Sequence, residues 1–201
     1  MKFLSTSRVL LVLLSVTLLT ACASTDSYPE DWSPVVAAEK GDCSALVGTF
    51  NNGYSKSTPD ALRMKGGLIA LLIGSPSSTK SDDAPPVTWV SIEQPSADRL
   101  VVSGFNGAKV VRRGERPLER GACSRKGLSV SGKFEGVNAE NVVGFLSASG
   151  TLRRNSDGDL VARIRSTFTG VALLVPMTSS VTSWYRFRKI ERRPTPDDPV
   201  Q

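Results

Sequence analysis

The feature that most limits the fold of this chain is a series of short alternating segments between residues 87 and 190. In residues 159–168 (DLVARIRSTF), apolar or small side chains at 160, 162, 164, 166 and 168 alternate with a second set that contains Arg163 and Arg165. This period of two is typical of a β-strand with one buried face. The other segments with strand character are residues 87–93, 99–105, 108–113, 127–134, 142–154, 171–175 and 181–190.

Turn-forming residues separate these segments. Asn106-Gly107 is the commonest signal for a two-residue hairpin turn, and residues 155–158 (NSDG) form another turn signal. The sequence therefore predicts a mainly β domain of about eight short strands, arranged as an antiparallel up-and-down barrel or as a sandwich. One helix is expected near the start of the domain, over about residues 59–73, because Pro59 suits a first turn and leucines and isoleucines then recur at helical spacing.

Residues 1–21 have the pattern of a bacterial export signal. Lys2 and Arg8 precede an apolar run that is shorter than the about 20 residues of a permanent membrane helix. The following Leu19-Thr20-Ala21-Cys22 resembles the lipobox of bacterial lipoproteins. That resemblance implies cleavage before Cys22, a diacylglycerol on its thiol and acylation of its new amino group. Ala23 then favours the outer membrane over the inner one. The alternative is an ordinary cleaved signal, in which Cys22 carries no lipid.

The rest of the chain divides into three parts. Residues 22–42 read as a lipid-anchored flexible tether, residues 43–190 as a single β-rich domain, and residues 191–201 as a disordered tail. In an oxidising compartment, Cys43 and Cys123 are expected to form a disulfide. The alternative is a pair of free thiols or metal ligands, although the sequence has no CxxC motif and no histidine to complete a zinc site.

The lack of histidine also removes the usual Ser-His-Asp and Cys-His catalytic arrangements.

Three weaker patterns remain. Residues 77–80 (SSTK) fit the S-x-x-K pattern of penicillin-binding enzymes, but the SDN-like and KTG-like elements are missing. Residues 155–159 lack the spacing and the final Glu of a calcium loop, so a hairpin turn is expected there. Glu135 and Glu140 could pair as glycosidase carboxylates, and solvated loop charges are the alternative.

Two basic clusters are candidates for docking. Arg112, Arg113, Arg116 and Arg120 lie in the most charged segment, and they form a candidate patch for lipid phosphates, acidic glycans or an acidic protein. A solvated loop is the alternative. The second cluster surrounds residues 184–187 (WYRF), where the Tyr185 and Phe187 face is expected to pack in the core.

Three stretches resemble a loose group of short proteobacterial lipoproteins. They are residues 43–54 (CSALVGTFNNGY), 157–164 (DGDLVARI) and 183–190 (SWYRFRKI). The group has no established activity, so the resemblance implies no catalytic residues. Residues 48–50 (GTF) also resemble the Gly-x-Trp of lipocalins, with Phe in place of Trp, which is compatible with an up-and-down barrel.

The sequence thus predicts a lipid-anchored protein on the periplasmic face of the outer membrane, acting as a binding or structural module of the cell envelope and not as an enzyme. The expected partners are the membrane, through the N-terminal lipid, and an envelope protein, a glycan or a small apolar ligand. No cofactor, metal or nucleic acid is expected. The alternatives are a histidine-free envelope hydrolase that uses carboxylates, and an immunity or inhibitor lipoprotein that binds a toxin or an enzyme.

Overall fold

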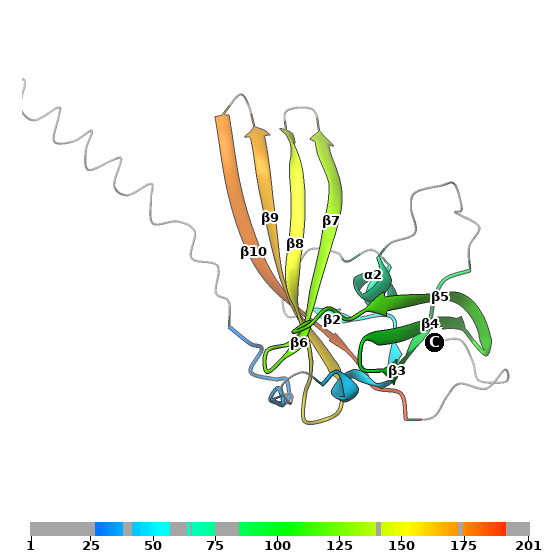
Figure 1. Ribbon diagram of the computed structural model, residues 1–201. Coiled ribbons are helices and arrows are strands. Elements are labelled where there is room, and N and C mark those ends of the chain that lie inside the picture. Colours follow the sequence, from blue (N-terminus) through cyan, green and yellow to red (C-terminus); the bar gives the residue numbers. More distant parts are fainter. Residues whose placement is uncertain are drawn as a thin grey trace, which may run out of the picture.

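The computed structural model describes residues 27–37, 42–56, 64, 66–74, 85–139, 142–172 and 175–191. Within these residues the chain is mainly β, as predicted, and its ten strands form two antiparallel sheets (Figure 1). The four-stranded sheet has the order β1-β3-β4-β5, with β1 (Gly48–Asn51), β3 (Trp89–Ser96), β4 (Arg99–Asn106) and β5 (Lys109–Pro117). The six-stranded sheet has the order β2-β10-β9-β8-β7-β6, with β2 (Ser55–Lys56), β6 (Cys123–Ser124), β7 (Gly127–Ala139), β8 (Val142–Arg154), β9 (Leu160–Ala172) and β10 (Val175–Phe187).

The two sheets form a sandwich-like arrangement and not a closed barrel. They join along one side, where Asn51 donates its N–H to the carbonyl of Arg188 at 2.9 Å and Ile190 donates to the carbonyl of Thr49 at 2.8 Å. On the other side, the helix α2 (Gly67–Ile73) packs against β4, β5 and β7. Because the helix fills the space between β5 and β7, no strand ladder closes that side in the described part of the chain.

The core lies between the sheets and under α2. Its largest fully buried side chains come from both sheets and from the helix: Phe50, Phe187, Leu68, Ile69, Leu72, Ile92, Leu100, Leu128, Leu152 and Leu160. Tyr185 is also buried, so the prediction that Tyr185 and Phe187 face the core is confirmed. The predicted disulfide is present as well. Cys43 and Cys123 are bonded, with their Cα atoms 5.6 Å apart, and the bond ties the start of the domain to β6.

Strand β8 spans the predicted residues 142–154, whereas β7, β9 and β10 are longer than the strands we predicted. Each spans 13 residues, and β9 pairs with β10 without a break from Leu160↔Phe187 to Ala172↔Val175. One half of these strands packs over the core, and the other half extends away from the body of the molecule (Figure 1). We call this second half, which includes residues 142–149, 166–172 and 175–182, the projecting end. We predicted residues 171–175 and 181–190 as two strands, but Val171 and Ala172 end β9, Val175 begins β10, and residues 181–187 belong to β10.

Helix α2 is shorter than predicted, because it begins at Gly67, after Gly66 in a left-handed conformation. Residues 57–63 and 65, which include the predicted start at Pro59, lie outside the described residues. Asn52 caps the helix from a distant part of the chain: its Oδ1 accepts the N–H of Ile69 at 3.0 Å, and its Nδ2 donates to the carbonyl of Gly66 at 3.2 Å. A Cβ on Gly67 would lie 2.1 Å from the carbonyl oxygen of Asn52, so only glycine fits there.

The predicted hairpin at Asn106-Gly107 is present, but its register differs by one residue. Asn106 pairs with Lys109, so the two central residues of the turn are Gly107 and Ala108. Gly107 has a φ of 54°, which suits a turn that needs a left-handed residue at its first central position.

Residues 27–37, which fall within the predicted tether, lie against the body of the protein. We call this segment the strap. Val36 donates its N–H to the carbonyl of Arg154 at 2.9 Å, and Ser156 donates to the carbonyl of Pro34 at 2.9 Å. Trp32 is only 6% exposed. Within the described residues, packing against the body therefore begins in the strap, at Tyr28, and not at Cys43.

Candidate interaction surface

The arginines of the predicted docking patch do not share one surface. Arg112, Arg113 and Arg116 lie on strand β5, and Arg120 follows in the next turn, so this segment is mostly a strand and not a solvated loop. Arg112 and Arg116 point toward α2. Arg112 donates to the carbonyl of Gly74 at 2.5 Å, and Arg116 donates to the carbonyl of Leu72 at 2.8 Å.

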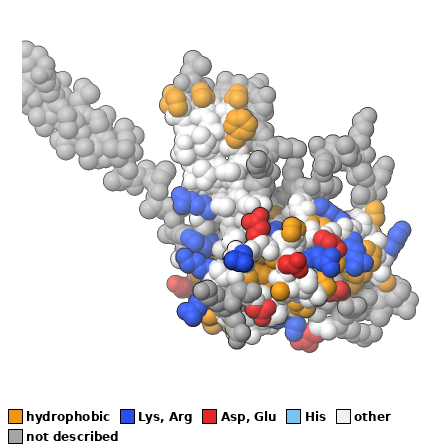
Figure 2. Space-filling view, in the orientation of Figure 1, with side chains coloured by type: hydrophobic (Ala, Val, Ile, Leu, Met, Phe, Trp, Pro, Cys, Tyr) orange, Lys and Arg blue, Asp and Glu red, His pale blue; other side chains and the backbone are white. Residues whose placement is uncertain are grey.

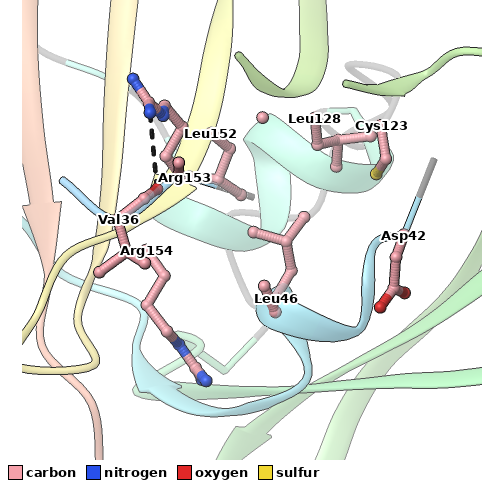
Figure 3. A pocket seen from close by; sticks show the side chains of 11 residues that line it. Val36, Asp42, Leu46, Cys123, Leu128, Leu152, Arg153 and Arg154 are labelled. Atoms are coloured by element: carbon pink, nitrogen blue, oxygen red, sulfur yellow. Dashed lines mark hydrogen bonds between the residues drawn. The ribbon is translucent and has the colours of Figure 1, made fainter. Parts of the chain in front are cut away.

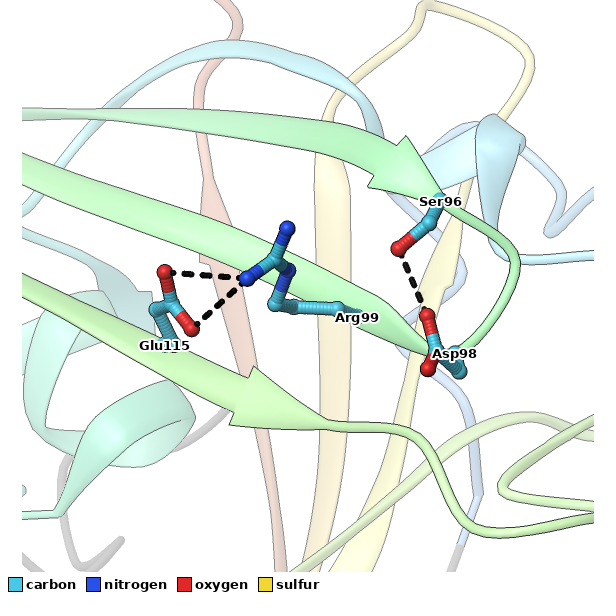
Figure 4. Close-up of polar contacts among 4 residues, drawn as sticks. All are labelled: Ser96, Asp98, Arg99 and Glu115. Atoms are coloured by element: carbon cyan, nitrogen blue, oxygen red, sulfur yellow. Dashed lines mark hydrogen bonds and ion pairs between the residues drawn. The ribbon is translucent and has the colours of Figure 1, made fainter.

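The last carbonyls of a helix have no hydrogen-bond partners inside the helix, and these two arginines donate to such carbonyls. Their positive charge also interacts favourably with the negative end of the helix dipole. Burial lowers the pKa of both guanidinium groups. Their role is therefore to hold β5 against α2. Arg113 lies on the opposite face of β5, which also carries the exposed ion pair of Glu115 with Arg99 at 3.2 Å (Figure 4).

Arg186 of the second basic cluster helps to hold the strap in place. Arg186 and Trp184 lie on the face of β10 that is turned away from the core. The guanidinium of Arg186 lies 5.0 Å from the ring centre of Trp32, and the ring centre of Tyr28 lies 5.0 Å from that of Trp184 in an edge-on contact. Burial raises the pKa of Tyr28, which donates its hydroxyl to the carbonyl of Ser33 at 2.6 Å. These aromatic and basic side chains bind the strap to the base of β10.

Of the sequence patterns that suggest catalysis or metal binding, one lies in the described residues and the others lie outside them. The turn at residues 155–159 is present as predicted: Asn155 accepts the N–H of Asp159 at 2.8 Å on its Oδ1, and Asp159 accepts the N–H of Lys189 at 2.8 Å. Where the chain is described, no group of three Cys, Asp or Glu side chains is placed to hold a metal ion. Residues 77–80, Glu140 and the side chain of Glu135 lie outside the described part of the structure, and so does Cys22.

A small cavity lies beside the disulfide, between the 3-10 helix η1 (Ser44–Leu46) and strand β8 (Figure 3). Its volume is about 80 Å³. Its lining includes Leu46, Cys123, Leu128 and Leu152. Pockets that bind drug-sized ligands typically have volumes of about 300–1,000 Å³. This cavity is therefore too small for a ligand of that size.

A wider and open depression crosses the outer face of the six-stranded sheet. It has a volume of about 440 Å³. Most of its lining consists of hydroxyl side chains from β7 and β8 and two arginines of β9, namely Ser129, Ser131, Ser149, Thr151, Arg163 and Arg165. The depression lies between the strap and the projecting end. It is a polar and basic surface next to the apolar one described below.

The most unusual surface is the projecting end itself. Its apolar side chains are exposed: Phe145 is 76% exposed, and Val143 and Val175 are each 63% exposed. Val171, Met177 and Val181 are also exposed. Figure 2 shows these side chains gathered at the free end, away from the charged side chains of the body. Large exposed apolar groups that lie together mark sites of interaction.

Sequence reasoning missed this surface, although one signal for it was present. Residues 141–152 and 166–185 contain no Asp, Glu, Lys or Arg. A strand with a solvated outer face normally carries charges there, as Arg163 and Arg165 do nearer to the body. No helix in the described residues has the length and apolar character needed to cross a membrane.

No protein-family model matches the chain, and no curated protein or solved structure shows significant similarity to it.

Proposed function

We propose that this chain is a lipid-anchored protein of the bacterial outer membrane that faces the periplasm and acts as a binding or structural module of the cell envelope, without catalytic activity. The projecting end of β7–β10 is its binding surface. The observation that carries this proposal is the exposure of Val143, Phe145 and Val175 on strands that extend beyond the core.

The energetics of these side chains support a binding role. Burying a valine or phenylalanine stabilises a complex by about 1.5–3 kcal/mol compared with leaving it in water. In the described residues of the projecting end, no second sheet or helix covers these side chains. Extending four strands beyond the core leaves apolar groups in water, and a partner that covers them offsets this cost.

The lipobox supports the anchoring part of the proposal. The first test is the substitution Cys22→Ser, followed by labelling of growing cells with a radioactive fatty acid. The wild-type protein should incorporate the label and the substituted protein should not, because a single residue carries all the proposed acyl chains. If both proteins carry the label, or neither does, the lipid anchor at Cys22 is wrong.

The second test compares the two candidate surfaces directly. A photo-crosslinking amino acid replaces Phe145 in one variant and Arg113 in another, because both side chains are exposed but lie on different sheets. We expect adducts to an envelope component, protein or lipid, at position 145 and not at position 113. Adducts at position 113 alone, or at neither position, would contradict the proposal that the projecting end is the binding surface.

A further inference from the structure

We propose that the free end of β7–β10 inserts into the surface of a lipid bilayer. The inserting side chains are Val143, Phe145, Val171, Val175 and Met177, which we call the tip cluster. This inference rests on the proposed function above, because it specifies what the projecting end binds.

The tip cluster covers both faces of the sheet. Val143 pairs directly with Val171, so these two side chains and Phe145 share one face. Val175 pairs with Ala172, and Val175 and Met177 therefore lie on the opposite face. A protein partner that packs on a sheet covers one face, whereas the interior of a membrane surrounds an inserted edge on all sides. The apolar character of both faces thus favours lipid over a second protein layer.

The depth of the apolar band matches a shallow insertion. Thr169 and Thr178 lie level with Phe145, and the exposed hydroxyl side chains of Ser147, Ser149 and Ser179 lie farther from the free end. Two residues of a strand span about 7 Å, and apolar groups of surface-bound segments enter the headgroup–acyl boundary by about 5–10 Å. The hydroxyl groups then lie among the headgroups, where they have hydrogen-bond partners. Residues 141–152 and 166–185 have no charged side chain, so their insertion dehydrates no charge. Glu135 and Glu140, which precede these stretches in the sequence, must stay hydrated at the headgroup level, so the insertion is limited to a shallow one.

The edges of the sheet set the limit of insertion. Strand β10 pairs with β2 only at Tyr185 and Arg186, so its edge is open along the described projecting end. Open sheet edges do not occur in the hydrocarbon region of a membrane, because their N–H and C=O groups have no partners there. The hydrated interface can satisfy these groups. We therefore infer insertion of the tip only, and not a span of the bilayer.

The proposed anchor brings this tip within reach of the membrane. Four residues lie between Cys22 and Ser27, the first described residue of the strap, and these five residue steps span at most about 18 Å. Tyr28 of the strap contacts Trp184, and nine residue steps of strand, about 30 Å, lead from Trp184 to Val175. The distance from Trp184 to the tip is thus greater than residues 23–26 can span. The tip meets the same membrane surface when the strands point toward it.

The test uses the mature chain with Cys22→Ser, so that no acyl chain can cause binding, and vesicles of phosphatidylethanolamine and phosphatidylglycerol. In a flotation assay, the protein should rise with the vesicles. The double substitution Val143→Ser and Phe145→Ser should weaken the partition by about tenfold or more, because it removes two exposed apolar groups. High salt should change the partition little, since apolar contact and not charge carries it.

Val110→Ser is the matched control, because Val110 is a similarly exposed valine on strand β5 of the other sheet. It should leave the partition unchanged. Circular dichroism and the urea midpoint confirm that each variant is folded. The inference is overturned if the folded chain does not float, if the double variant floats as well as the parent, or if salt abolishes binding. Adducts at position 145 in cells without vesicle binding would overturn this inference alone and leave the proposed function standing.

Discussion

Arg116 and Leu72 meet where strand β5 passes the end of helix α2, and Nη1 of Arg116 donates to the Leu72 carbonyl at 2.8 Å. Nη2 of the same guanidinium donates to the carbonyl of Ser129 on β7, also at 2.8 Å. One side chain therefore connects β5, α2 and β7 on the side of the sandwich where α2 takes the place of a strand ladder. Its loss should destabilise the fold and leave any docking surface unchanged.

We expect Arg116→Met to lower the free energy of unfolding by about 1–3 kcal/mol, because two charge-assisted hydrogen bonds are lost while most of the apolar stem is kept. Urea denaturation of the oxidised protein measures this. Arg113→Met is the control, since Arg113 is exposed on the opposite face of β5, and it should change stability by less than about 0.5 kcal/mol. Equal effects of the two substitutions would contradict this assignment.

Asn52 is expected to be the most sensitive polar residue of the core. Besides capping α2, its Nδ2 donates to the carbonyl of Val87 at 3.1 Å. Asn52→Ala leaves the N–H of Ile69 and two carbonyls without these partners, so it should cost about 1–3 kcal/mol in urea unfolding. Asn51→Ala is the matched control, because Asn51 is exposed on β1. If both variants have the same urea midpoint, Asn52 does not hold the helix.

The β architecture could largely be predicted from the sequence, because alternation and turn residues are local signals. The length of the strands could not be predicted in the same way. The pairing of β9 with β10 continues past the core through residues that are typical of a loop, such as Pro176 and Ser179. A strand at the edge of a sheet can contain a proline because its outward N–H needs no partner. The length of the projecting end thus depends on pairing between distant segments.

The candidate site was predicted less well, for a related reason. Arg112 and Arg116 look like free positive charges in the sequence, but their partners are backbone carbonyls of a helix about 40 residues earlier in the chain. Charge counting cannot find such partners. The exposed tip cluster was missed because valine and phenylalanine in a strand normally indicate burial. Only the long absence of charged residues could have indicated it.

The disulfide should stabilise the protein mainly through the unfolded state. Cys43 and Cys123 are separated by 80 residues, and the chain-entropy model gives roughly 4 kcal/mol for a loop of that length. The double substitution Cys43→Ala and Cys123→Ala should lower the free energy of unfolding by about this amount while the near-ultraviolet spectrum stays native. A reducing agent should then have no further effect on the variant. A loss below about 1 kcal/mol would show that the bond constrains little.

High pH should weaken the fold through Tyr185. Burial raises the pKa of this tyrosine above its ordinary value of 10.0, so the folded state favours the protonated phenol. This contribution is fully present below about pH 10 and is lost as the pH rises through the higher folded-state pKa. The free energy of unfolding should therefore fall above about pH 10, and it should fall less steeply in Tyr185→Phe. Urea titrations at about pH 9 and about pH 11 measure this, and identical slopes for both proteins would exclude a role for Tyr185.

The strap should open more readily when its aromatic contact is removed. Trp32 is 6% exposed and lies against Arg186 and Tyr28, so Trp32→Ala removes both packing and a cation–π contact. A protease that cuts after glutamate should then cleave at Glu30 about tenfold faster or more, because local opening becomes easier by at least about 1.4 kcal/mol. Val36→Ala is the control, because Val36 is exposed on the same segment. The cleavage rate gives the loss in the free energy of local opening, and urea denaturation gives the loss in the free energy of global unfolding. If the two losses are equal for Trp32→Ala, the strap opens with the whole domain and not by itself.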